Sequence, residues 1–315
     1  LSAVAEGTFE PPVRVRYETC YPGETFEVAG AAGVRRIPAD VPGEKVVDGV
    51  RLNVLPCGRD ELVARCVRHI VRKQQCLDQE SPLYGAFLIY DGTTGRQYFD
   101  NRFSDHNACR ERLGMGLLVA RWLQTHDDRE VREAFDRYEA FVFREFVDRD
   151  TGMSYNTIGK DPSVRRLYNA PNCALLMLEL YRLRKDVSYL RTAVKVLLEY
   201  YGAGGWKFYA NGALATARTI AAARREGIDA AELARQYRRQ IDRILANDIE
   251  YPPHEVKFEQ TIVTPAVALL AQYGLFVERD PKVLDGLRRQ LEMLVRFDGD
   301  QPDWRSGGVP IRHWD

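Results

Sequence analysis

No stretch of this 315-residue chain is apolar for long enough to span a lipid bilayer, and no signal peptide is visible. The chain also has no net charge at neutral pH, because 45 basic residues balance 45 acidic ones. Binding to nucleic acid or to a membrane surface needs a basic footprint, so we expect neither partner. The balance still allows a local basic pocket for a carboxylate.

Sequence strings typical of nucleotide sites (GxGxxG, the P-loop) and of serine nucleophiles (GxSxG) are absent. None of the six cysteines forms a CxxC pair, and the five histidines are scattered. We therefore expect buried free thiols, no metal and no cofactor. Free thiols favour the cytoplasm over an oxidising compartment.

What is present is enough apolar sequence, 45% of the residues, to bury a large core. Apolar and polar residues alternate in three short stretches before residue 57, at 13–17, 26–28 and 50–54, with Gly and Pro between them. This pattern predicts a β-rich segment over 1–57, followed by a helical domain over 58–315. The chain starts at Leu1 rather than Met and ends without a tapering tail, so we expect it to be part of a longer protein.

From residue 59 onward, apolar residues recur every three or four positions, which predicts helices joined in pairs by short turns. The predicted ranges are 59–79, 107–126, 128–147, 171–184, 187–201, 212–226, 229–247, 265–277 and 280–296.

An internal repeat organises these helices. Three times, a Leu-Leu pair is followed ten residues later by an aspartate, and a degenerate fourth copy ends in the same way. These aspartates are Asp128, Asp186, Asp280 and, in the degenerate copy, Asp229. We interpret Asp128, Asp186 and Asp280 as N-caps of the second helix in their pairs. In two copies a proline, Pro171 or Pro265, precedes the Leu-Leu pair and fits the first turn of a helix.

The first helix of most pairs is apolar all round, whereas its partner is more charged. This difference predicts an inner and an outer layer, and hence an all-α fold: an (α/α)6-type toroid, incomplete within this chain. An open superhelix of repeats is the alternative architecture.

In a double ring the inner helices run parallel, so the loops leading into them converge on one face. These loops are rich in acids, bases and aromatic residues, which suits a sugar substrate. The candidate catalytic carboxylates are Asp105, Glu111, Glu255 and Glu259. The candidate substrate-binding residues are Tyr98, Arg102, His106, Arg110, Trp206, His254, Arg312, His313 and Trp314. Taken singly, each residue could instead be a helix cap, an ion-pair member or part of the core.

Three segments resemble six-hairpin glycosidase-like proteins: Tyr98–Gly116, Tyr251–Pro265 with its His254-Glu255-x-Lys257-Phe258-Glu259 string, and Arg312–Asp315. Within that group the chain looks most like glycoside hydrolase family 154, over residues 59–315. The resemblance implies a full (α/α)6 toroid, with closing helices beyond Asp315, and β-glucuronidase activity.

These observations leave three hypotheses. The main one is a glycoside hydrolase acting on uronic-acid-containing glycans, in which Glu255 or Glu259 works with Asp105 or Glu111 on an oligosaccharide or glycoside substrate. The second is a polysaccharide lyase on the same scaffold, with His106, His254 or Tyr251 as base and an Arg or Asn to neutralise the uronate. The third is a non-catalytic helical-repeat protein that binds peptides or glycans.

Overall fold

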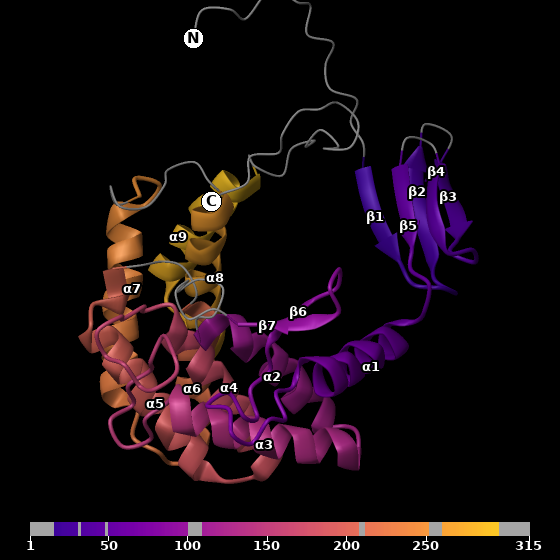
Figure 1. Ribbon diagram of the computed structural model, residues 1–315. Coiled ribbons are helices and arrows are strands. Elements are labelled where there is room, and N and C mark those ends of the chain that lie inside the picture. The colour runs from indigo at the N-terminus through magenta and orange to yellow at the C-terminus, as the bar shows by residue number, and fades with distance from the viewer. Residues whose placement is uncertain are drawn as a thin grey trace, which may run out of the picture. The chain divides into compact units, whose positions relative to one another are not determined.

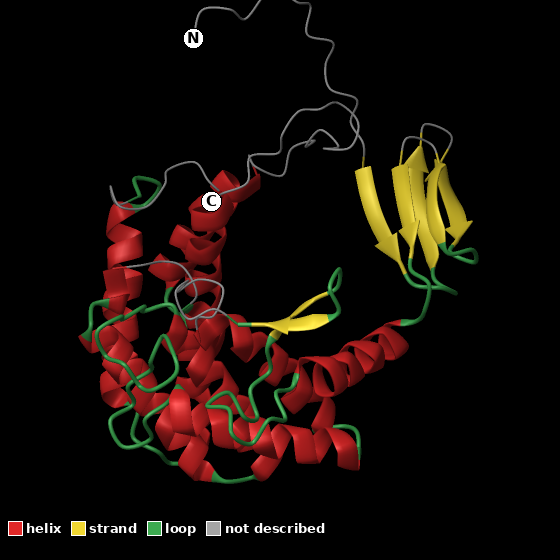
Figure 2. Cartoon of the chain, viewed as in Figure 1, coloured by secondary structure: helices red, strands yellow, loops and turns green. Residues whose placement is uncertain are grey.

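In a computed structural model, the described chain divides into a β-rich unit, which extends to Arg65, and a helical unit, Cys66–Leu294. Figures 1 and 2 show the elements of both. The structure describes residues 16–30, 33–47, 50–99, 109–207, 212–251 and 260–295, and for a few residues beside the gaps it describes the backbone alone. The boundary between the units lies within the first helix. The division after residue 57 stays a prediction.

Five strands form the β-rich unit: β1 (Arg16–Cys20), β2 (Thr25–Gly30), β3 (Gly33–Pro38), β4 (Gly43–Val47) and β5 (Val50–Val54). Strand β5 pairs with β1 in parallel and with β4 antiparallel, whereas β2 and β3 form a separate antiparallel pair. A small core of Cys20, Ile37, Ala39, Leu52 and Val54 holds the unit together. The predicted strands at 26–28 and 50–54 lie in β2 and β5. The strand predicted at 13–17 overlaps β1, although its first three residues lie outside the described chain.

Nine α-helices are present in the described part of the chain: α1 (Arg59–His69), α2 (Cys109–Leu123), α3 (Arg129–Glu145), α4 (Asn169–Arg184), α5 (Val187–Gly202), α6 (Ala213–Arg225), α7 (Ala231–Asn247), α8 (Gln260–Phe276) and α9 (Pro281–Val295). The protein is thus mostly helical after a short β-rich segment, as predicted. The ends of α2 to α9 lie within five residues of the predicted ends.

The helices from α2 onward form four hairpins, and their first members lie side by side in the order α2, α4, α6, α8. Helix α4 is buried over nearly its whole first ten residues, whereas α3 buries a single stripe of residues. This is the difference between an inner and an outer layer that the composition indicated. Figure 1 shows the hairpins following one another through the helical unit.

Aspartate caps begin three of the outer helices, which confirms the interpretation of the repeat for Asp128, Asp186 and Asp280, whereas Asp229 lies one residue before Ala230, the N-cap of α7. Each carboxylate accepts the backbone N–H of a residue two or three positions further on. The four bonds join Val131 to Asp128 at 3.2 Å, Ser188 to Asp186 at 2.8 Å, Ala231 to Asp229 at 2.9 Å and Lys282 to Asp280 at 2.9 Å.

Two local predictions were wrong. Pro265 does not begin a helix, because α8 already starts at Gln260 and Pro265 is its sixth residue. The first helix does not reach residue 79, because α1 passes into a short π-helix, Ile70–Gln74, and ends there. Buried Gln75 then turns the chain by donating to the Ala134 carbonyl at 2.7 Å and accepting from Arg137. These partners are distant in sequence, so helical periodicity alone could not reveal the end.

A short hairpin of two strands, β6 (Ile89–Asp91) and β7 (Arg96–Tyr98), follows this turn. It was not predicted. Five of the six cysteines are buried, as predicted, whereas Cys66 is exposed. No helix in the described ranges is long and apolar enough to cross a membrane.

Candidate functional site

The inner helices begin at one end of the helical unit and the tight hairpin turns lie at the other. Each hairpin reverses the chain within a few residues, so α2, α4, α6 and α8 run in the same direction. The predicted loops lead into the beginnings of these helices. The described helices are therefore arranged as convergence requires, although parts of the loops before α2, α6 and α8 lie outside the described residues.

Most of the predicted site lies outside the described residues. This holds for Asp105, Glu255, Glu259, Arg102, His106, His254, Arg312, His313 and Trp314. Arg110 and Glu111 lie in the first turn of α2, where the structure describes the backbone alone. The roles given to these residues stay predictions, as does their meeting around one cavity.

The described part of this end contains a buried asparagine pair. Asn169 is the first residue of α4, and Asn156 lies in the loop that leads towards it. The Asn169 Nδ2 donates to the Asn156 Oδ1 at 3.0 Å, and both residues are 0% exposed. The Asn156 Nδ2 is buried but has no hydrogen-bond partner among the described residues. A buried amide donor without an acceptor is costly unless a ligand or water satisfies it.

The same pair connects α4 to α2. The Cys109 N–H, at the start of α2, donates to the Asn156 backbone carbonyl at 2.9 Å. The Cys109 Sγ lies 3.6 Å from the Cys173 Sγ, one turn into α4, and both thiols are fully buried. The beginnings of two inner helices and one loop are thus held in contact. Neither Asn156 nor Asn169 was among the predicted site residues, because asparagine beside a helix start also suits a cap or a turn.

Trp206, a predicted substrate-binding residue, lies in a short 3-10 helix, Gly205–Lys207, after α5. Its ring is half-buried and lies beside two guanidinium groups of α7, with the Arg239 Cζ 4.2 Å and the Arg243 Cζ 4.9 Å from the ring centroid. These side chains cover part of the ring. Sugar stacking on Trp206 stays a prediction, and it would have to use the rest of the ring.

Tyr98 is the other described candidate. It ends strand β7 and is 42% exposed. The neighbouring Gln97 Nε2 donates to the Lys73 and Gln75 carbonyls at 3.0 and 2.8 Å, which fixes this strand against the end of the π-helix. Because Tyr98 is exposed, a ligand can reach it. Its role as a sugar contact stays a prediction.

Tyr251, a possible base in the lyase hypothesis, is buried, and its hydroxyl donates to the Gln290 Oε1. Gln290 in turn donates to the Asp248 carbonyl at 2.7 Å. This chain of bonds ties the segment after α7 to α9. The phenol thus has a structural role, and the choice of base among Tyr251, His106 and His254 stays a prediction.

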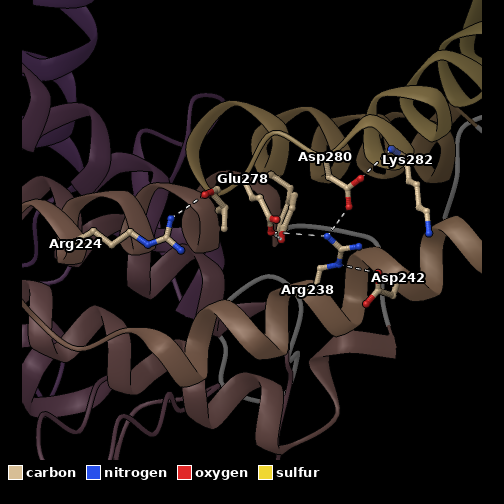
Figure 3. A network of polar contacts seen from close by, with 8 residues as sticks. Arg224, Arg238, Asp242, Glu278, Asp280 and Lys282 are labelled. Atoms are coloured by element: carbon tan, nitrogen blue, oxygen red, sulfur yellow. Dashed lines mark hydrogen bonds and ion pairs between the residues drawn. The ribbon is translucent and has the colours of Figure 1, made fainter.

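At the opposite end of the helical unit, ion pairs hold the hairpin turns together. Figure 3 shows Arg238 of α7 between Asp242 and Asp280, to which its guanidinium binds at 2.8 and 2.7 Å. The hydrogen bonds from the Arg238 side chain and from the Lys282 N–H both lower the pKa of Asp280. Arg224 also donates to the Val277 carbonyl at 2.8 Å. These contacts explain charged residues that have no place in the candidate site.

A second structural carboxylate, Glu179, lies in α4, where its side chain is buried. It accepts from Gln124 at 2.8 Å, from Arg121 at 3.1 Å and from Arg182 at 2.9 Å. Burial raises the pKa of Glu179, but these donors and charges outweigh it, so that the pKa lies below its usual value. A lowered pKa suits an ion pair rather than a general acid. No group of three metal-ligating side chains occurs among the residues that the structure describes.

A solved polysaccharide lyase has a closely similar structure. The two superpose with a TM-score of 0.78 and share 26% sequence identity over 95% of this chain. The chain spans about half the length of that lyase, 50% of it. No family model matches the chain, and the search of curated proteins gives no relative. The similarity supports a helical fold of the kind used by polysaccharide-processing enzymes, and gives no support to β-glucuronidase specifically.

Proposed function

We propose that this chain carries the helical part of a polysaccharide lyase that cleaves uronate-containing polymers by β-elimination. The observation that carries the proposal is the similarity to a polysaccharide lyase over nearly the whole chain. Fold alone does not establish function, but here about a quarter of the aligned residues are identical, and the inner helices all begin at one end of the helical unit. The lyase hypothesis is therefore better supported than the hydrolase hypothesis. The proposal includes a toroid completed beyond this chain.

The proposed chemistry sets three demands on the site. A donor must neutralise the uronate carboxylate, because this makes the C5 hydrogen acidic. A base then takes the C5 proton, the electrons form a C4=C5 double bond, and the C4–O bond breaks. The leaving oxygen takes up a proton from an acid or from water. We assign the base to His106 or His254.

The asparagine pair supports the first demand. An amide that is buried at the beginning of an inner helix, with a donor hydrogen left without an acceptor, suits a carboxylate oxygen. The beginning of a helix also favours negative charge. We therefore propose that Asn156 and Asn169, together with Arg102 or Arg110, neutralise the uronate.

The hydrolase hypothesis makes different demands, namely two carboxyl groups on either side of the scissile bond. Its candidates are Asp105, Glu111, Glu255 and Glu259. Under hydrolysis, Asp105→Asn or Glu255→Gln would lower turnover by orders of magnitude, whereas under elimination both variants would keep most of their activity as long as substrate still binds.

The test is to incubate the purified protein with uronate polymers, such as polygalacturonate and alginate, and to follow ultraviolet absorbance and new reducing ends in parallel. Elimination makes one conjugated double bond for each new reducing end, so the two signals rise together. Reducing ends without absorbance would show hydrolysis and overturn the lyase proposal. Neither signal on any uronate polymer would count against both enzymatic hypotheses.

A further inference from the structure

Helix α7 carries two arginines that lack the ion pairs of their neighbours. Arg235 binds Glu232 at 2.6 Å, and Arg238 binds Asp242 and Asp280. Arg239 and Arg243, one turn apart on the same helix, have no carboxylate within ion-pair distance in the part of the chain that the structure describes. The Arg243 Nε is also buried without a hydrogen-bond partner there.

Both unpaired guanidinium groups lie against Trp206. Their Cζ atoms are 4.2 and 4.9 Å from the centre of the same ring, which is close enough for a cation–π contact. Like charges one turn apart on a helix repel each other. The ring therefore holds these two guanidinium groups in fixed positions, with the Lys207 Nζ 5.6 Å from the same centroid, although mutual repulsion would separate the cations. Such an arrangement is preorganised for an anion that bridges both groups.

The position on the helix connects this cluster with the candidate site. Arg243 lies in the last turn and a half of α7, an outer helix, and Trp206 lies in the connection between α5 and α6. Both features belong to the end of the helical unit where the inner helices begin. A polymer bound at the proposed active site could therefore contact this cluster through a sugar unit several positions away from the cleaved bond.

We propose that Arg239, Arg243 and Trp206 form an additional binding subsite for a uronate carboxylate of the polymer. The planar guanidinium groups bind the carboxylate in a forked, two-bond geometry, while Trp206 orients them. The carboxylate also supplies the acceptor that the Arg243 Nε lacks. This assignment rests on the proposed function in one respect, namely that the anion is a uronate.

Binding and turnover are measured separately, so that the subsite and the proposed activity can fail independently. Affinity electrophoresis in gels containing polygalacturonate, alginate or dextran sulfate measures binding to two uronate polymers and to a sulfated one, with neutral dextran as the blank. The variants are Arg239→Gln and the double variant with Arg243→Gln. The matched control is Arg235→Gln, which removes an ion-paired arginine from the same helix. Thermal unfolding checks that each variant is folded.

We expect the double variant to bind at least one uronate polymer about tenfold more weakly, the single variant to lose part of this affinity, and the control to bind normally. Arg239 is exposed, so its variant tests the subsite even if the change at Arg243 lowers stability. The proposal is overturned if no uronate polymer binds, if both variants bind like the wild type, or if the control weakens binding equally. If the double variant loses as much affinity for dextran sulfate as for the uronate polymers, the cluster is a general anion site and its assignment to uronates is overturned. If uronate binding depends on these arginines but no unsaturated product forms, the result would support the subsite and overturn the lyase proposal.

Discussion

Asn169 donates from its side-chain amide to the side-chain oxygen of Asn156 at 3.0 Å, with both residues fully buried where α4 begins. The bond fixes the loop before α4 to the helix itself. It also leaves the Asn156 amide without an acceptor among the described residues. The pair is therefore both a structural contact and the strongest described candidate for a carboxylate-binding group.

Asn169→Ala should remove the donor and leave the Asn156 oxygen buried and unpaired. We expect the free energy of unfolding to fall by about 1–3 kcal/mol, and lyase turnover to fall much more than the affinity for the polymer. Urea unfolding and steady-state kinetics measure the two effects. Asn172→Ala, which removes an exposed bond to the Tyr168 carbonyl, is the control and should change both values little. Normal turnover in Asn169→Ala would remove the pair from the mechanism.

Two glycines of α2 give a matched test of how the helices pack. A Cβ added at buried Gly116 would lie within 2.5 Å of the Tyr138 Cζ, and that ring is held in place by stacking on Phe87 at 4.4 Å between centroids. Gly116→Ala should therefore lower stability by about 1–3 kcal/mol. Gly114 is exposed and has open space around it, so Gly114→Ala should raise stability by up to about 1 kcal/mol. Chemical unfolding of both variants is the measurement, and equal effects would contradict the observed contact between α2 and α3.

Glu179 should contribute to stability in a pH-dependent way. Its pKa is lower in the folded protein than in the unfolded chain, so its contribution is present at neutral pH and is lost as the pH falls through the unfolded and then the folded value. Glu179→Gln should cost about 1–3 kcal/mol at pH 7, and this difference from the wild type should shrink below about pH 4.5. Unfolding measured from pH 7 to pH 3 follows the change. Exposed Glu232, whose pKa is also lowered by Gln236 and Arg235, provides the control variant Glu232→Gln. A pH-independent loss at Glu179 would show that packing rather than charge is responsible.

Much of the helical fold could be predicted because the relevant signals are local. The capping aspartates lie next to the helices that they begin, and the apolar repeat marks each inner helix along its own length. The predicted helix ends were wrong where residues distant in the sequence determine the structure. Gln75 ends the first helical segment through Ala134 and Arg137, about sixty residues away. Pro265 resembles a first-turn proline in sequence, yet the helix extends five residues before it.

Less of the candidate site could be predicted from the sequence. The converging loops were identified by their composition, but composition cannot separate a ligand-binding asparagine from a turn or cap residue. Asn156 and Asn169 stand out only when burial shows an amide without an acceptor. In the same way, Arg239 and Arg243 are ordinary residues of a charged outer helix until the ion pairs of Arg235 and Arg238 are known.

The mass of the reaction products tests the central claim most directly. When the purified protein has cleaved a uronate oligosaccharide, mass spectrometry of the fragment from the new non-reducing end distinguishes the two reactions. We predict a fragment lighter by one molecule of water than the hydrolysis product, because elimination leaves a C4=C5 double bond and adds no water. A fragment with the full hydrolytic mass would contradict the account.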